Sequence, residues 1–194
     1  INYRTTEEIR KYAYAILTGL SFDDLDGNTD DGRESRSFTH GPEPIVKHFT
    51  TSADEANYIA EEVMRLLERG VSTKDICVVA RTKKLLDVYM ATFNAANLRC
   101  FEIKSTKLDD RDLEGVRFAT MHRVKGLEFP YVFVAGVNNG IVPLETAIDH
   151  TDSVSEAETL KSEKCLIYVA LTRTQKCAYV TSYGKASLIL PERK

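Results

Sequence analysis

The chain has 194 residues, of which 43% are hydrophobic and 28% charged, a balance typical of a soluble globular domain with a sizeable core. No apolar run approaches the roughly 20 residues of a membrane span and no signal-peptide segment is recognisable, so we expect no membrane partner. The net charge of −3 argues mildly against a strong, free-standing nucleic-acid binder, which usually carries a basic footprint, so any DNA contact must come from a local patch. The four cysteines lack C-x-x-C spacing, which favours reduced thiols in a cytoplasmic protein over zinc ligands.

The first predicted element is a helix. The chain begins at Ile1, and we expect the natural N-terminus to lie upstream of it. Thr5 and Thr6, followed by two glutamates, predict a helix start, and Gly19 a stop. Residues 21–44 are acidic and rich in turn-forming residues. They fail the calcium-loop template, which needs Gly at its sixth and Glu at its twelfth position, so we predict a flexible acidic surface loop.

Strands and helices then alternate to the end of the chain. We predict strands at 45–49, 76–80, 99–103, 116–120, 131–135 and 178–182. We predict a helix capped by Ser52 or Asp54 and ending near Gly70, another beginning at Thr82, and a last helix over 155–174. This alternation predicts an α/β fold with a mostly parallel sheet flanked by helices, and we expect residues 1–194 to form one domain.

The densest polar cluster falls between two predicted strands, in the sequence FATMHRVKGLEFP at residues 118–130. Ligands of open α/β sheets bind beyond the carboxyl ends of strands, so we expect this cluster to lie at such an end. Gly126 would allow close backbone approach to a ligand, and Glu128 could accept a hydrogen bond from a ribose hydroxyl. A solvated surface connection is the alternative interpretation of the same composition.

Two arginines lie at predicted helix ends. Arg173 closes the last helix, where it could present a fixed cation to phosphate oxygens or cap the carbonyls of its own helix. Arg4 directly precedes the first helix, whose N-terminus is a favourable place for an anion.

Taken in order, these segments resemble the conserved motifs of superfamily 1 DNA helicases of the UvrD/Rep/PcrA type. Residues 2–5 (NYRT) are similar to motif IV, residues 120–129 (TMHRVKGLEF) to motif V and residues 168–173 (YVALTR) to motif VI. Residues 78–82 (VVART) are similar to the strand-to-helix segment between motifs IV and V. The resemblance spans nearly the whole chain and implies the second RecA-like motor domain, a P-loop NTPase-type fold without its own phosphate loop.

The resemblance implies a role in ATP hydrolysis for one set of residues. Arg4 and Arg173 would face the ATP γ-phosphate and stabilise charge on the transferring phosphoryl group. Glu128 would hold the ribose, and Gly126 would let the backbone pass close to it. Arg4, Glu128 and Arg173 must then converge on one edge of the folded sheet.

A second set of residues is implied in DNA binding. Thr120 and His122 would contact the backbone of single-stranded DNA. Arg81 and Lys125 are candidates for either DNA contact or local ion pairing. ATP and Mg²⁺ would be bound jointly with an N-terminal RecA-like domain of the same parent chain, and no metal site is expected in this chain itself.

Two departures from the family pattern leave an alternative open. No G-x-x-x-x-G-K-S/T motif is present, so we expect the chain to be inactive as an ATPase on its own. The accessory domain usually inserted in the second motor domain is also missing, since about a dozen residues join Ile103 to Val116. The alternative is a non-catalytic, helicase-like module for nucleic-acid or protein interaction. We find no Ser-His-Asp or Cys-His arrangement that would indicate a complete small enzyme.

Overall fold

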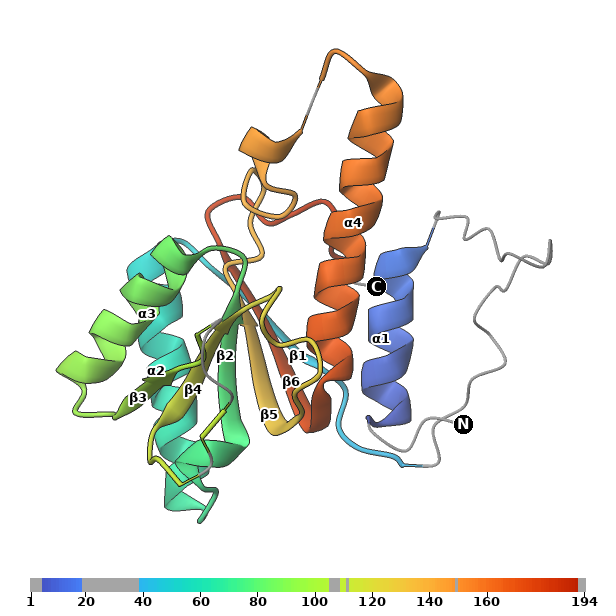
Figure 1. Cartoon of the computed structure of the whole chain (residues 1–194). Helices are drawn as coiled ribbons and strands as arrows, with labels where there is room; N and C mark the ends of the chain where they lie inside the picture. The colour runs from blue at the N-terminus through green and yellow to red at the C-terminus, as the bar shows by residue number, and fades with distance from the viewer. Residues whose placement is uncertain (1–4, 19–38, 105–108, 111, 149, 192–194) are drawn as a thin grey trace.

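The structure, a computed structural model, describes residues 5–18, 39–104, 109–110, 112–148 and 150–191. Within these ranges the helices are α1 (Glu7–Leu17), α2 (Ser52–Glu68), α3 (Lys83–Ala95) and α4 (Ser153–Thr172), with short 3-10 turns η1 (Thr73–Asp75) and η2 (Glu145–Ala147). The strands are β1 (Ile45–Phe49), β2 (Ile76–Ala80), β3 (Cys100–Glu102), β4 (Val116–Thr120), β5 (Phe129–Ala135) and β6 (Thr174–Tyr183). The predicted α/β class is confirmed (Figure 1).

Every pair of neighbouring strands is parallel, in the order β1-β6-β5-β2-β4-β3. A parallel sheet therefore has one end where strands begin and another where they finish. We name these the amino end, which includes Phe129 and Thr174, and the carboxyl end, which includes Ala80 and Thr120. These two ends decide which of the predicted site residues can act together.

Helices cover both faces of the sheet: α2 and α3 pack on one face, and α1 and α4 on the other (Figure 1). Strand β2 shows the division, because Cys77 and Val79 join the core under α1 and α4 while Val78 joins the opposite core. All five residues of β2 are buried, as predicted for a central parallel strand.

Threonine hydroxyls begin three of the helices. The side chains of Thr6, Thr51 and Thr82 each accept a hydrogen bond from the backbone N–H three residues further on. The predicted starts at Thr6 and Thr82 are confirmed. The prediction for α2 was wrong by one residue or more, since Thr51 is the cap rather than Ser52 or Asp54.

Strands β5 and β6 begin earlier than the sequence predicts, at Phe129 instead of Tyr131 and at Thr174 instead of Ala178. Pro130 cannot donate to a sheet and interrupts the strand pattern, yet the N–H of Phe129 donates to the carbonyl of Arg173 at 3.0 Å. These earlier starts place Glu128 and Arg173 directly before paired strands.

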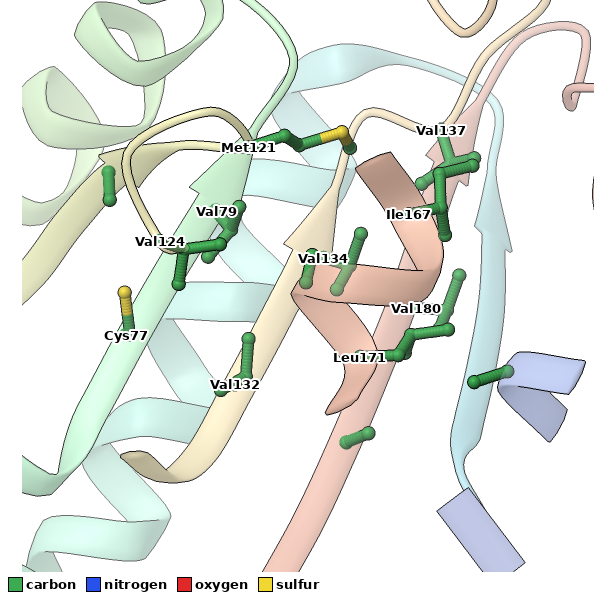
Figure 2. Close-up of a cluster of buried hydrophobic side chains, with 14 of the residues drawn as sticks. Cys77, Val79, Met121, Val124, Val132, Val134, Val137, Ile167, Leu171 and Val180 are labelled. Atoms are coloured by element: carbon green, nitrogen blue, oxygen red, sulfur yellow. The ribbon is translucent and has the colours of Figure 1, made fainter. Parts of the chain in front are cut away.

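The connection from β4 to β5 is unusual because residues 121–128 cross the sheet without forming a helix. Parallel strands are normally joined by a dozen or more residues, most often a helix. Here Met121 and Val124 are fully buried in the core under α4, and Leu127 packs against that core (Figure 2). His122, Arg123 and Lys125 remain exposed between these apolar anchors, so the crossover is held firmly to the sheet while its polar side chains face solvent.

The predicted acidic loop at 21–44 lies mostly outside the described residues, and its described part, 39–44, has no regular secondary structure. Among the helices that the structure describes, none has the length and apolar character to cross a bilayer.

Candidate functional site

Glu128 and Arg173 lie next to each other at the amino end of the sheet. Each immediately precedes a strand, and the first residues of those strands, Phe129 and Thr174, are paired. Gln175 strengthens the link, because its side-chain nitrogen Nε2 donates to Glu128 Oε2 at 3.3 Å. Gln175 was not predicted, although alternation along a strand places residues 173 and 175 on the same side.

Arg173 retains donor capacity at this position. Its backbone N–H closes α4 by donating to the carbonyl of Ala170 at 3.3 Å, while its Nη2 lies 3.5 Å from Thr172 Oγ1. The buried Nε has no hydrogen-bond acceptor among the described residues. Burial raises the pKa of nearby Tyr168 to about 12, so this phenol stays neutral and does not compensate the charge of Arg173. Phosphate oxygens are acceptors that suit such a guanidinium.

The start of α1 lies at the same end of the molecule as the end of α4 (Figure 1). A Cβ added to Gly41 would lie 2.6 Å from Thr6 Cγ2 and 3.4 Å from the carbonyl oxygen of Lys176, so Gly41 is tightly packed between α1 and β6. The N–H of Glu7 donates to the carbonyl of Thr39 at 2.8 Å and holds this arrangement. Arg4 itself lies outside the described residues, and its convergence with Glu128 and Arg173 stays a prediction.

The residues predicted to contact DNA begin at the carboxyl end of the sheet and continue into the crossover. Arg81 follows β2 and Thr120 ends β4, and these neighbouring strands pair Ala80 with Thr120. His122 and Lys125 are exposed in the crossover, with no side-chain ion pair or hydrogen bond to the part of the chain that the structure describes.

Arg81 differs from the other candidates because it forms an ion pair within the domain. Its Nε and Nη2 donate to both carboxylate oxygens of Glu163 at 2.8 to 3.0 Å. Of the two roles that the sequence left open for Arg81, local ion pairing is the one seen in the structure. Glu163 was not predicted as its partner.

The expectation that the whole polar cluster at 118–130 lies at the carboxyl end of the strands was wrong. Thr120 is at the carboxyl end, whereas Glu128 is at the amino end, because the crossover runs the length of the strands between them. Gly126 makes the last turn of that crossover with a φ of +88°, a conformation that favours glycine, and a Cβ there would meet nothing within 4 Å. The space beside Gly126 leaves room for close approach from outside.

A buried carboxylate, missed in the sequence, organises the carboxyl end. Glu55 on α2 is fully buried and accepts hydrogen bonds from the Tyr89 hydroxyl at 2.6 Å and the Gly136 N–H at 3.0 Å. Burial raises the pKa of Glu55, with these hydrogen bonds opposing the shift. Gly136 has to be small here, since a Cβ would lie 2.9 Å from both Leu85 and the Tyr89 hydroxyl.

No group of three or more His, Cys, Asp or Glu side chains within the described ranges is arranged to hold a metal ion. The chemistry available at the amino end is therefore that of an arginine beside a carboxylate. This pair can bind phosphate oxygens through the guanidinium and hydroxyl groups through the carboxylate.

A parallel α/β domain with an arginine and a carboxylate side by side at one end of its sheet has the groups to bind a phosphorylated ligand. The sequence matches the family of UvrD-like helicase C-terminal domains over residues 1–113 and 105–185, and the chain belongs to this family. The resemblance to UvrD/Rep/PcrA-type helicases is thereby confirmed.

Individual relatives agree with this assignment. YjcD of Bacillus subtilis is 34% identical over 149 residues, which is 76% of this chain and 18% of that protein. The ATP-dependent DNA helicases Rep of Escherichia coli and PcrA of Staphylococcus aureus are 37% and 34% identical over 43% and 44% of this chain, and 12% of each relative. The chain thus spans less than a fifth of the length of these relatives.

A solved structure has the same fold. The C-terminal domain of a possible DNA helicase from Lactobacillus plantarum superposes with a TM-score of 0.66. The match covers 98% of this chain and 92% of that one, at 16% sequence identity.

Proposed function

We propose that this chain is the second motor domain of an ATP-dependent helicase or translocase that acts on single-stranded DNA in the cytoplasm. ATP would be bound between the amino end of this sheet and an N-terminal RecA-like domain of the same parent chain. That domain would carry the phosphate loop and the ligands for Mg²⁺, which would neutralise charge on the phosphates. The observation that carries the proposal is the buried Nε of Arg173 without an acceptor among the described residues, directly beside Glu128.

In this proposal Arg173, together with Arg4, donates to the γ-phosphate and stabilises the charge that spreads over its oxygens during transfer. Glu128 accepts a hydrogen bond from a ribose hydroxyl, and the open space at Gly126 lets the nucleotide come close to the backbone. Water activation and the attack on the phosphoryl group belong to the other domain.

Thr120 and His122 would contact the DNA backbone at the carboxyl end of the sheet, and Lys125 would contact it further along the crossover. The eight residues of the crossover, 121–128, join these side chains to Glu128 without an intervening helix. Because Met121 and Val124 anchor the crossover in the core, it moves as one body with the sheet. Nucleotide and DNA would thereby bind at different places on one rigid unit. Closure of the two domains around ATP would then move the bound DNA strand.

The test uses the full parent chain in a DNA-stimulated ATPase assay. Arg173→Lys keeps the charge but loses the planar fork, and we expect kcat to fall about 10³-fold, as for other arginines that stabilise phosphoryl transfer. Lys176→Gln is the control: Lys176 is an exposed cation on β6, the strand that follows Arg173, and its change should leave kcat unchanged. Equal rates for Arg173→Lys and wild type would exclude the proposed role of Arg173. ATP hydrolysis by residues 1–194 alone would contradict the proposal that the phosphate loop and the Mg²⁺ ligands lie in the N-terminal domain.

The net charge of −3 favours a second candidate, a helicase-like module that binds a partner without hydrolysing ATP. The sequence upstream of Ile1 discriminates the two. A phosphate-loop motif there supports the motor, and its absence supports the interaction module.

A further inference from the structure

The ion pair between Arg81 and Glu163 joins two segments that are 82 residues apart in sequence. Arg81 Nε lies 3.0 and 2.9 Å from the two carboxylate oxygens of Glu163, and Arg81 Nη2 lies 2.8 Å from Glu163 Oε1. The side chains are 13% and 4% exposed, so the contact is largely shielded from solvent. Arg81 belongs to the loop that leaves the central strand β2, and Glu163 lies in the middle of α4.

Helix α4 otherwise rests on the sheet through apolar contacts. Ile167 and Leu171 lie against the strands that carry Val134 and Val180 (Figure 2). Apolar packing is non-directional and specifies the axial position of a helix less sharply than a hydrogen bond of defined geometry does. A bidentate pair between a guanidinium and a carboxylate has a defined geometry, so it fixes the axial position of the helix.

Arg173 closes the same helix. Ten positions separate residues 163 and 173, which is about 15 Å along an α-helix. Since a helix is rigid over this length, any shift of Glu163 along the axis displaces Arg173 by a similar amount. The pair therefore sets the position of Arg173 at the amino end from a site near the carboxyl end.

We infer that Arg81 and Glu163 are positioning residues for Arg173: their ion pair fixes α4 so that the guanidinium of Arg173 is placed for phosphoryl transfer, and Arg81 is not a DNA contact. This inference rests on the proposed function of Arg173. With Nε and Nη2 directed to Glu163 and only 13% of the side chain exposed, the guanidinium of Arg81 is turned into the domain rather than toward a DNA phosphate outside it.

The experiment uses Arg81→Lys and Glu163→Gln in the full parent chain, with ATPase kinetics and single-stranded DNA binding at several salt concentrations. Both changes remove the bidentate geometry, and we expect kcat to fall about ten- to a hundredfold, as for other small misplacements of a catalytic group. The affinity for DNA and its salt dependence should stay as in wild type. Arg81→Gln, which also removes the charge, is measured alongside: a salt slope smaller by about 0.7 in that variant, for one lost phosphate contact, with kcat preserved at saturating DNA, would instead identify Arg81 as a DNA contact and overturn the inference.

A double-mutant cycle separates positioning from a general loss of stability. In an Arg173→Lys background, Arg81→Lys should lower kcat by less than twofold further, because its effect acts through Arg173. Full additivity would refute that connection. Lys83→Gln is the matched control, since Lys83 is 49% exposed, two residues from Arg81, and paired with Asp87 and Glu102 rather than with α4.

Thermal unfolding of each variant is measured alongside. If Arg81→Lys unfolds below the assay temperature, Glu163→Gln decides the outcome, and a wild-type kcat for that variant overturns the inference. A parent chain without any DNA-stimulated ATPase would refute the proposed function instead. An active parent that loses activity with Arg173→Lys and keeps it with Arg81→Lys would refute only the positioning role.

Discussion

The arginines at the two ends of the sheet, Arg81 and Arg173, differ in their hydrogen-bond partners. At the carboxyl end, Arg81 directs both Nε and Nη2 to Glu163 within the same domain. At the amino end, Arg173 has one long contact with the Thr172 hydroxyl, and its buried Nε has no acceptor in the described part of the chain. A buried donor without an acceptor costs about 1 to 3 kcal/mol, so the amino end holds its arginine at a cost that the carboxyl end does not carry.

This contrast shows that the partner of an arginine, rather than its place at a strand or helix end, separates a structural from a functional role. Arg81 and Arg173 both follow an apolar element and both precede a new one. Only the folded structure reveals that Arg81 already has a carboxylate partner.

Removing the carboxylate at the amino end is the most direct test of whether the two ends of the sheet bind different ligands. Glu128→Ala in the parent chain should remove a charge-assisted hydrogen bond to ribose worth about 1.5 to 3 kcal/mol, which raises the KM for ATP by about ten- to more than a hundredfold. The affinity for single-stranded DNA should not change, because Glu128 lies at the opposite end from Thr120 and His122. ATPase titrations and DNA-binding isotherms measure the two effects.

His122→Ala is the matched change at the carboxyl end and should show the opposite profile. It should weaken DNA binding and leave the KM for ATP at saturating DNA as it is. If both variants weakened ATP and DNA binding alike, the two ends could not be separate sites.

The crossover that joins the two ends should also contribute to the stability of the fold. Val124 is fully buried beneath α4, and Val124→Ala should lower the free energy of unfolding by about 2 kcal/mol through lost burial and the cavity left behind. Val88→Ala is the matched control, because Val88 is 41% exposed on α3 and its truncation should cost about 0.5 kcal/mol or less. Urea unfolding of both variants measures the difference, and equal midpoints would show that the crossover is not anchored.

Much of the fold could be predicted because its central strands, such as β2 and β4, are short runs buried on both faces. The strands at 45–49, 76–80 and 116–120 have the predicted bounds. The start of β6 was missed, because Gln175 and Lys176 are exposed polar residues and hide the strand pattern. Local sequence patterns therefore predict buried strands well, but they miss the start of a strand whose first residues are exposed and polar.

The candidate site could be predicted only where the chemistry is local in sequence. Glu128 and Arg173 were identified through motifs that each lie within one short segment. The partner of Arg81 and the network of Glu55 with Tyr89 depend on contacts between residues 82 and 34 positions apart, which no spacing rule covers. The separation of Thr120 from Glu128 was missed for a related reason, since a crossover without a helix is rare between parallel strands.

The smallest effect concerns the support of the amino end near the start of α1. Glu8 on α1 accepts hydrogen bonds from His40 at 2.9 Å and from the Gly41 N–H at 2.8 Å, which lower the pKa of Glu8 to about 2 from an ordinary value of 4.5. A carboxyl group with a lowered pKa in the folded state stabilises that state above pH 4.5, and this contribution is lost as the pH falls toward 2.

Glu8→Gln should therefore unfold at lower urea concentration than wild type at pH 7, and the gap between the two midpoints should close between pH 4.5 and pH 2. Glu61→Gln, an exposed carboxylate on α2, controls for the change in net charge. A gap that persisted unchanged at pH 2 would mean that packing, rather than the charge of Glu8, ties residues 40 and 41 to α1. In that case buried contacts that do not depend on pH would support both ends of the sheet. The two ends would then differ only in the hydrogen-bond partners of their arginines.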